Sequence, residues 1–266
     1  MTQVNNTSSR IVIEVGSQFH EIAGLDHEVS INRPEGRELP TCDLVVHNIT
    51  PANIRSMQTE GGRVFVYATV DDVEYTLFTG NVASVVAEYE GVDLRTDIMV
   101  TDARNNMKTK VKLSYPAGKR IADVVRDVCG QAGMTVQTIE SPFADAVFES
   151  SYAYSGTARR ALDQLTKRAG AIWRVHDGQV SIGTRESLSR RTGMRYTADT
   201  GMIGSPKLLD DGKMQLEAIL SPQITNGSII QVQSQFVDGW YRVESHTHQF
   251  GSRDAVWTTT IECKEA

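Results

Sequence analysis

The sequence predicts a mainly β (α+β) protein, with two antiparallel barrel-like β domains separated by a small α/β insertion of two helix-strand units. Three observations support this fold class. Short apolar runs alternate with Gly and Asp turns from Ile11 to Thr101. Helical periodicity of apolar residues then begins near Lys119 and occurs twice. After Arg195 the chain returns to short alternating runs.

These changes of pattern divide the chain into four segments. We expect a polar N-terminal tail over 1–10, a first β-barrel-like domain over 11–114, an α/β insertion domain over 115–196 and a second β-barrel-like domain over 197–266. A chain of 266 residues is long enough to build more than one compact domain.

The first β domain is predicted to consist of short strands joined by tight turns, which is typical of an antiparallel sandwich or barrel. Asp71-Asp72 and Glu90-Gly91 are the expected hairpin turns. A weak helical pattern covers Pro51–Met57. The expected strands are Ile11–Val15, Cys42–His47, Arg63–Val70, Glu74–Phe78, Gly80–Glu88 and Leu94–Thr101.

The insertion is predicted to repeat a helix, a glycine and a strand. The first helix has one buried stripe, made by Ile121, Val124, Val125 and Val128. Gly130 and Gly133 are predicted to end this helix, Gly133 with a positive φ, and a strand follows over 134–139.

The second helix of the insertion begins near Ser155, which together with Thr157 has a hydroxyl suited to capping its first turn. Gly170 ends it, and Asp177-Gly178 is a strong hairpin signal between two strands, Ala171–Val175 and Gln179–Ile182. Its buried stripe is Ala158, Ala161, Leu162, Leu165 and Ala169.

The second β domain is predicted from alternating runs separated by Gly, Pro and Asp turns. Asp210-Asp211-Gly212, Pro222–Gly227 and Asp238-Gly239 are the expected turns, and Gly201-Met202-Ile203-Gly204 is also interpreted as one. The expected strands are Pro206–Leu209, Lys213–Leu220, Ser228–Gln235, Trp240–His248 and Val256–Cys263.

The charge balance argues against non-specific binding of nucleic acid. The net charge is -6 and the sequence pI is near 5.6, whereas neutralising phosphates needs clustered Lys and Arg. The densest basic stretch contains Arg185, Arg190, Arg191 and Arg195 and is expected to be a solvated loop.

No export or membrane segment is recognisable in the sequence. The first ten residues lack the apolar core of a secretory signal, and no run of about 20 apolar residues is present, so we expect synthesis in the cytoplasm without membrane insertion. Cys42, Cys129 and Cys263 lack zinc-site spacing and cannot all pair within one chain. Cys129 is expected to be buried on its helix.

A search for catalytic motifs finds no nucleophile elbow, phosphate-binding loop or dinucleotide fingerprint, and predicts no catalytic residue and no cofactor. Glu88 and Glu90 flank Tyr89, and Asp210 and Asp211 lie in a turn. Neither carboxylate pair has the apolar surroundings that would raise a pKa for acid–base work.

The strongest metal candidate is His246-Thr247-His248, because residues two apart on a strand point to the same face. Glu244 extends this row. The set lacks a fourth ligand, so a bound ion at His246 and His248 is one interpretation and a solvated or interface face is the favoured one.

Aromatic residues offer a carbohydrate platform as a further possibility. Trp173, Trp240, Trp257 and Tyr241 are the candidates, but core packing is favoured for most of them. Trp240 and Tyr241 are adjacent in a predicted strand and must face opposite ways, so one of the two is expected in the core.

The residues from Thr200 onward carry a recognisable pattern. It runs T-G-M-I-G-S-P-K-L-L-D-D-G-K-M-Q-L-E-A-I-L-S-P-Q-I, then G-S-I-I-Q-V-Q-S, G-W-Y-R-V-E-S-H-T-H and W-T-T-T-I-E-C. This pattern resembles the C-terminal β domain of baseplate hub proteins of contractile phage tails and related injection machines. The opening R-I-V-I-E-V and the helix I-A-D-V-V-R-D-V-C-G-Q-A-G resemble them too.

The resemblance implies a virion structural protein of the tail baseplate rather than an enzyme. In that family two pseudo-symmetric barrel-like domains flank an α/β insertion. Three copies form a ring that adapts the sixfold tail tube to the threefold spike, around a channel through which DNA slides without specific binding. The implied partners are therefore a homo-trimer, tail tube subunits and the central spike protein.

Two other functions remain open on the sequence. One is a carbohydrate-binding β module of a receptor-binding tail part, which would need coplanar exposed aromatics. The other is a tail-associated peptidoglycan hydrolase, which would need a carboxyl group in an apolar cleft.

Overall fold

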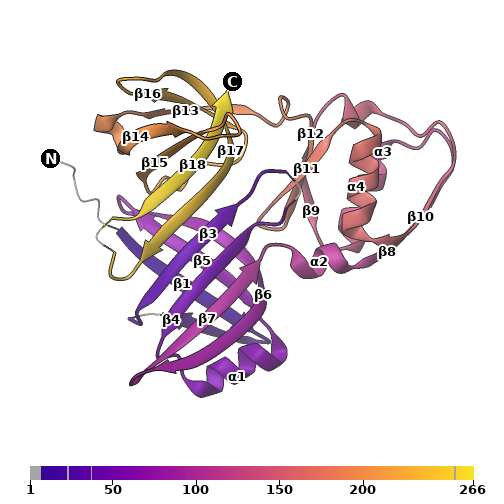
Figure 1. Ribbon diagram of the computed structural model, residues 1–266. Coiled ribbons are helices and arrows are strands. Elements are labelled where there is room, and N and C mark those ends of the chain that lie inside the picture. Colours follow the sequence, from indigo (N-terminus) through magenta and orange to yellow (C-terminus); the bar gives the residue numbers. More distant parts are fainter. Residues whose placement is uncertain (1–6, 23, 37, 255) are drawn as a thin grey trace. The chain divides into compact units, whose positions relative to one another are not determined.

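The computed structural model describes residues 7–22, 24–36, 38–254 and 256–266, and it is mainly β with a few helices, as predicted (Figure 1). The chain divides into two compact units. The sheet unit comprises Met1–Glu35, Pro40–Thr101 and Arg191–Ala266, and the α/β unit comprises Gly36–Leu39 and Asp102–Arg190. The finer division into two barrel-like domains with the boundaries given above stays a prediction.

The sheet unit is built on one 13-stranded sheet with the order β14-β15-β18-β17-β3-β4-β7-β6-β5-β1-β2, in which β16 also pairs with β17 and β13 with β16. Among the described strands this order does not close into a barrel. The elements are β1 (Thr7–Val15), β2 (Gln18–Ile22), β3 (His27–Arg33), β4 (Thr41–His47), α1 (Pro51–Glu60), β5 (Arg63–Val70), β6 (Val73–Glu90), β7 (Asp93–Thr101), β13 (Arg190–Tyr196), η2 (Ala198–Thr200), β14 (Met202–Leu208), β15 (Met214–Ile219), β16 (Ser228–Gln233), β17 (Asp238–Gly251) and β18 (Thr258–Glu265).

Two hydrophobic clusters lie within the sheet unit. The larger one gathers the inward side chains of β1 to β7, with Ile31, Leu44, Phe78 and Ile98 fully buried. The smaller one is formed by β14 to β18. We call the strands around them the N-terminal lobe and the C-terminal lobe. The two lobes share one sheet because β3 pairs with β17, a strand more than 200 residues later in the sequence.

Strand β6 is longer than the sequence indicated. The prediction of two strands, Glu74–Phe78 and Gly80–Glu88, was wrong, because β6 continues through Gly80. A Cβ atom at Gly80 would lie 2.7 Å from the Phe78 ring and 2.9 Å from the carbonyl oxygen of Thr101, so glycine here permits close packing and does not end the strand.

The α/β unit contains two small sheets and three α-helices (Figure 1). Strands β8 and β10 form an antiparallel ribbon, and β11, β12 and β9 form a three-stranded sheet in which β9 and β12 are parallel. The elements are α2 (Arg104–Lys108), β8 (Lys110–Tyr115), α3 (Ile121–Gln131), β9 (Thr135–Ile139), η1 (Phe143–Asp145), β10 (Tyr152–Thr157), α4 (Ala158–Arg168), β11 (Ile172–His176) and β12 (Gln179–Gly183).

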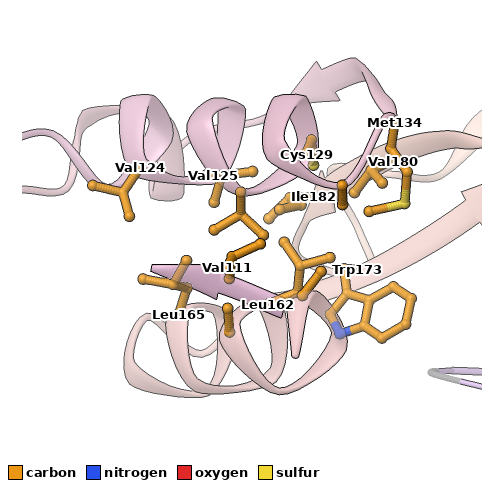
Figure 2. Packing of buried hydrophobic residues seen from close by; sticks show 14 of the residues in the cluster. Val111, Val124, Val125, Cys129, Met134, Leu162, Leu165, Trp173, Val180 and Ile182 are labelled. Carbon is orange, nitrogen blue, oxygen red and sulfur yellow. The ribbon is translucent and has the colours of Figure 1, made fainter. Parts of the chain in front are cut away.

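The predicted repeat of helix, glycine and strand is confirmed, except that Gly130 lies within α3 and Gly133, with φ 69, follows its end. Side chains from α3 and α4 face each other across the core of the unit, together with Trp173 and Val180 from the small sheet (Figure 2). Thr157 caps α4 by accepting a hydrogen bond from the Arg160 backbone N–H, whereas Ser155 lies in β10 and does not cap. The predicted stripes of both helices are buried except for Ala169, which is partly buried.

The tight turns were predicted with mixed success. Asp71-Asp72 and Asp177-Gly178 have positive φ at both residues, as expected for hairpin turns. The prediction of a turn at Asp238-Gly239 was wrong. Both residues belong to β17 and pair with Gln233 and Val232 of β16. The turn lies before β17, where the Ser234 backbone N–H donates to the Val237 carbonyl at 2.7 Å.

Two further expectations need correction. Gly201 does adopt a turn conformation with φ 94, but Met202 to Leu208 form β14 instead of continuing the turn. Pro206 is accommodated because β14 is an edge strand with an irregular register. Strand β1 begins at Thr7, so part of the expected polar tail is strand, and the first six residues lie outside the described part.

Candidate functional site

The candidate metal residues His246 and His248 lie on one face of β17, as predicted, but that face is buried. Both side chains are 2% exposed, and their ring centroids are 4.9 Å apart in an edge-on arrangement. The Nδ1 atom of His246 lies 2.9 Å from Asn226 Oδ1, and that of His248 lies 2.9 Å from Thr259 Oγ1. The favoured interpretation was a solvated or interface face, and the burial of both rings contradicts the solvated face.

Glu244 is buried like His246 and His248, with 2% of its surface exposed, and it stands at a β-bulge. The register between β17 and β18 shifts between Val243 and Ser245, so Glu244 is the additional residue of a β-bulge. Its buried carboxylate accepts a hydrogen bond from Arg242 Nε at 2.8 Å. Among the described residues, no group of three or more His, Cys, Asp or Glu side chains could hold a metal ion.

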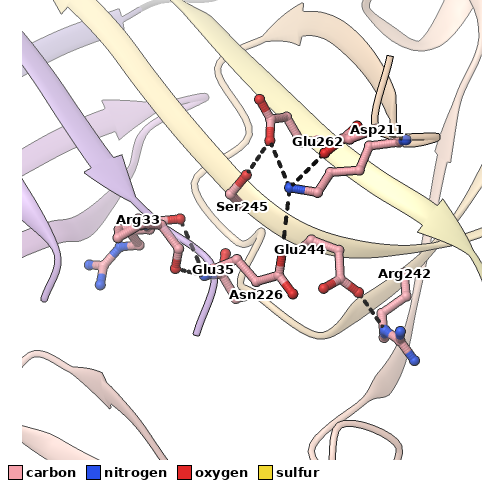
Figure 3. A network of polar contacts seen from close by, with 10 residues as sticks. Arg33, Glu35, Asp211, Asn226, Arg242, Glu244, Ser245 and Glu262 are labelled. Atoms are coloured by element: carbon pink, nitrogen blue, oxygen red, sulfur yellow. Dashed lines mark hydrogen bonds and ion pairs between the residues drawn. The ribbon is translucent and has the colours of Figure 1, made fainter. Parts of the chain in front are cut away.

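A network of charged side chains centres on Lys213, which begins the segment leading into β15 (Figure 3). Its Nζ atom lies 3.3 Å from Asp211 Oδ2, 3.4 Å from Glu35 Oε2 and 3.6 Å from Glu262 Oε2. Ser245 Oγ donates to Glu262 Oε2 at 2.9 Å. Partial burial opposes the charge on Lys213, but the hydrogen bonds and charges of Asp211 and Glu35 raise its pKa above the ordinary value.

The last residues of β3 are tied to the C-terminal lobe by further polar contacts. Asn226 Nδ2 donates to the carbonyl oxygens of Arg33 and Pro34 at 3.2 and 2.8 Å. Arg33 itself donates to the Leu77 carbonyl at 2.7 Å. Together with the Lys213–Glu35 ion pair, these contacts fix the segment 33–35 at the point where the chain leaves the sheet unit.

The aromatic candidates separate into core and surface. Trp173 and Trp257 are buried, and their indole N–H groups donate to Asp163 Oδ1 and to the Gly251 carbonyl. Trp240 is 40% exposed and lies against Arg191, with the guanidinium carbon 5.3 Å from its ring centroid. Tyr241 is partly buried and packs against the C-terminal lobe core, whereas Trp240 faces outward, so the two adjacent residues do face opposite ways.

The scattered carboxylates lie where the sequence placed them. Glu88 and Glu90 are exposed at the end of β6, where Glu90 lies 3.5 Å from Arg95. Asp210 and Asp211 occupy the turn before β15, and the Asp211 carboxylate accepts the Lys213 backbone N–H at 3.0 Å. This backbone hydrogen bond is the main cause that lowers the pKa of Asp211.

The Arg-rich segment is exposed as expected but is not a loop throughout. Arg190, Arg191 and Arg195 lie in β13, which pairs with β16. The three cysteines are all free and buried. Burial raises the pKa of Cys129 and of Cys263 to about 12 and that of Cys42 well above its ordinary value. In the described part of the chain, no helix is long and apolar enough to cross a membrane.

A surface feature that the sequence analysis did not identify is the tip of the β6–β7 hairpin. Tyr89 is 73% and Val92 is 93% exposed there. The sequence E-Y-E-G-V-D places an apolar residue in the turn of an acidic hairpin. This combination is the sequence signal that indicates an exposed apolar tip.

No protein-family model matches the sequence, and no curated protein matches it significantly. Solved structures do match. The 43 kDa tail protein of prophage MuSo2 from Shewanella oneidensis aligns with a TM-score of 0.70 and 13% identity, over 97% of both chains. A tail protein from Neisseria meningitidis MC58 gives a TM-score of 0.70 at 10% identity, again over 97% of both chains.

The chain has the fold of phage tail proteins. The resemblance predicted from the sequence is thus confirmed at the level of the fold. The c3393 protein of E. coli also matches, with a TM-score of 0.67 and 11% identity over 96% of this chain and 76% of that one. That protein is described as a component of the type VI secretion system with structural similarity to the T4 tail proteins gp27 and gp5.

Proposed function

We propose that this chain is a structural subunit of a phage tail baseplate hub, without catalytic activity. The proposal rests on the structural match to two phage tail proteins. Each match covers 97% of this chain and 97% of the other protein. A match of that extent includes the α/β unit as well as the large sheet. In this proposal three copies form a ring between the sixfold tail tube and the threefold spike, in the tail baseplate of the virion.

A threefold ring can present six similar positions only if each subunit contributes two similar domains. The two hydrophobic clusters of the sheet unit support this idea, since the N-terminal and C-terminal lobes each have a core. We propose that the two lobes are the barrel-like domains expected over 11–114 and 197–266. A closed ring also follows the general preference of homo-oligomers for point-group symmetry.

The solvent-facing side of the central strands has the chemistry of a surface along which DNA slides. Along β3, β4, β7 and β18 the buried residues alternate with outward residues, as in an antiparallel sheet with one packed face. The outward set has four acidic side chains, two cations (Arg95 and Lys264) and two apolar side chains (Val45 and Met99), and the rest are Ser, Thr, Asn or His: Glu28, Ser30, Asn32, Thr41, Asp43, Val45, His47, Arg95, Asp97, Met99, Thr101, Thr258, Thr260, Glu262 and Lys264. Acidic side chains repel phosphates, so such a face does not retain nucleic acid.

The proposed partners are tail tube subunits on one side of the ring and the central spike on the other. The similarity to c3393, which is itself described as similar to gp27 and gp5 of T4, supports this placement. The two alternatives have less support. The buried indoles of Trp173 and Trp257 are not available to a glycan, and the exposed carboxylates Glu88 and Glu90 lack the apolar pocket that a hydrolase needs.

Electron microscopy of the purified protein, alone and with spike and tube subunits, tests the proposal. We expect ring-shaped particles with threefold symmetry and an open centre, to which the spike adds on one face only. Particles without threefold symmetry in both samples would contradict it. Loss of turbidity of a cell-wall suspension, or binding to glycans at micromolar protein, would favour the hydrolase or the carbohydrate module instead.

A further inference from the structure

The two units of the chain differ strongly in charge. The α/β unit has 15 Lys and Arg against 10 Asp and Glu, a net charge of +5, whereas the sheet unit has 12 against 23, a net charge of -11. The overall value of -6 hides this contrast. In a ring of identical subunits, each interface joins one surface of a subunit to a different surface of the next subunit. Opposite charges on these two surfaces therefore favour the interface.

Part of the positive charge lies on the β8–β10 ribbon of the α/β unit. Lys110 and Lys112 are exposed on one face of β8, opposite Thr157 and Ser155 of β10. Arg160 is exposed in the first turn of α4, which follows β10 directly. Within the part of the chain that the structure describes, no carboxylate forms an ion pair with these three cations. We call Lys110, Lys112 and Arg160 the basic ribbon.

The counterpart is the tip of the β6–β7 hairpin, which we call the arm and define as residues 86–93. Strand β5 pairs with β6 only as far as Asn81, so β6 beyond that point has β7 as its strand neighbour. Tyr89 and Val92 are largely exposed at the tip, and the exposed carboxylates of Glu88 and Glu90 flank Tyr89 in the sequence. An apolar centre with a charged rim is typical of a protein–protein contact.

We propose that the arm of one copy docks on the basic ribbon of the next copy in the ring. Glu88 and Glu90, which are two apart on β6 and therefore share one face, would face Lys110 and Lys112, which share one face of β8. The proposal rests on the oligomeric ring of the proposed function. It names the two surfaces that hold neighbouring subunits together and makes their contact dependent on ionic strength.

Charge reversal in the full-length protein tests this pairing. The arm variant is Glu88→Lys with Glu90→Lys, the ribbon variant is Lys110→Glu with Lys112→Glu, and a fourfold variant combines them. Matched controls reverse exposed charges elsewhere, Glu21→Lys with Glu265→Lys and Lys167→Glu with Lys207→Glu. Absolute mass is measured by light scattering over a range of protein and salt concentrations, and thermal unfolding confirms that each variant is folded.

For a wild-type trimer, we expect the arm and ribbon variants each to raise the protein concentration needed for assembly at least about tenfold, since each places like charges together. The fourfold variant should recover most of the loss, and the controls should assemble as the wild type does. If the arm and ribbon variants form trimers at the same concentration as the wild type, the proposed pairing is overturned. The same holds if the fourfold variant needs as high a concentration as either double variant. Both results leave the proposed hub function untouched. A wild-type chain that stays monomeric, also in the presence of spike and tube subunits, would overturn the ring itself.

Discussion

His246 and His248 face the same way from β17, and their buried rings lie 4.9 Å apart. Each ring is oriented by a hydrogen-bonding side chain from another element, Asn226 for the first and Thr259 for the second. A pair held in this way is part of the packing between the strands. It is a structural feature of the C-terminal lobe and not an exposed ligand set.

Replacing Asn226 should therefore destabilise the protein. Asn226→Ala removes the partner of His246 and the hydrogen bonds to the carbonyls of Arg33 and Pro34. Leaving such groups unsatisfied costs about 1–3 kcal/mol, which chemical denaturation can measure. Added Zn²⁺ or a chelator should leave the melting temperature of the wild-type protein unchanged. A stabilisation by Zn²⁺ that is lost in His248→Ala would show that the histidines do bind an ion.

A matched pair of glycine substitutions tests the packing at the centre of β6. Gly80→Ala would place a methyl group 2.7 Å from the Phe78 ring and 2.9 Å from both Val100 and the Thr101 carbonyl, and should cost about 1–3 kcal/mol. Gly130→Ala, near the end of α3, meets no atom within 4 Å and should stabilise by about 0.5–1 kcal/mol. Equal effects of the two substitutions would contradict the close approach at Gly80.

The core of the α/β unit depends on Trp173, which is fully buried and donates its indole N–H to Asp163 at 2.9 Å. Trp173→Ala should lower the free energy of unfolding of the α/β unit by about 3–5 kcal/mol. We expect this unit to unfold while the sheet unit stays folded. Trp173→Phe retains most of the apolar contact and should cost less. Hydrogen exchange resolved by segment is the measurement, with lost protection expected in α3 and α4. Uniform loss across the sheet unit instead would contradict a separate core.

Alkaline pH should destabilise the fold through the buried thiols. Burial raises the pKa of Cys129 and Cys263 to about 12, whereas the unfolded thiols ionise near their ordinary value of 9.0. The unfolded state therefore binds fewer protons between these values, and stability falls as pH rises, by about 1.4 kcal/mol per pH unit for each thiol. Cys263→Ala should reduce this slope. An unchanged slope in the variant would show that other groups cause the loss.

The sequence predicted correctly those elements whose conformation depends on neighbouring residues alone. The stripe of α3, the Thr157 cap and the Asp71-Asp72 turn follow from side-chain spacing or local hydrogen bonding, and all are present. Strand β3 was missed because His27, Arg33 and their polar neighbours look like loop residues. Arg33 is buried only because β3 lies between β4 and β17, a pairing that no local pattern contains.

The candidate site was harder to predict for the same reason. Spacing placed Glu244, His246 and His248 on one face, but that face is buried because β17 pairs with β18 on one side and with β3 on the other. Contacts such as Lys213 with Glu35 join residues nearly 180 positions apart. Only the tertiary fold brings such residues together, so the charged network could not be derived from sequence.

The central claim is that three copies of this chain assemble into a closed ring. Absolute mass by light scattering, over a range of protein concentrations, tests it most directly. We expect a stable species of three times the 29.3 kDa chain mass and no larger, open-ended polymers. A strict monomer at every concentration, also in the presence of spike and tube subunits, or a closed assembly whose copy number is not three, would contradict it.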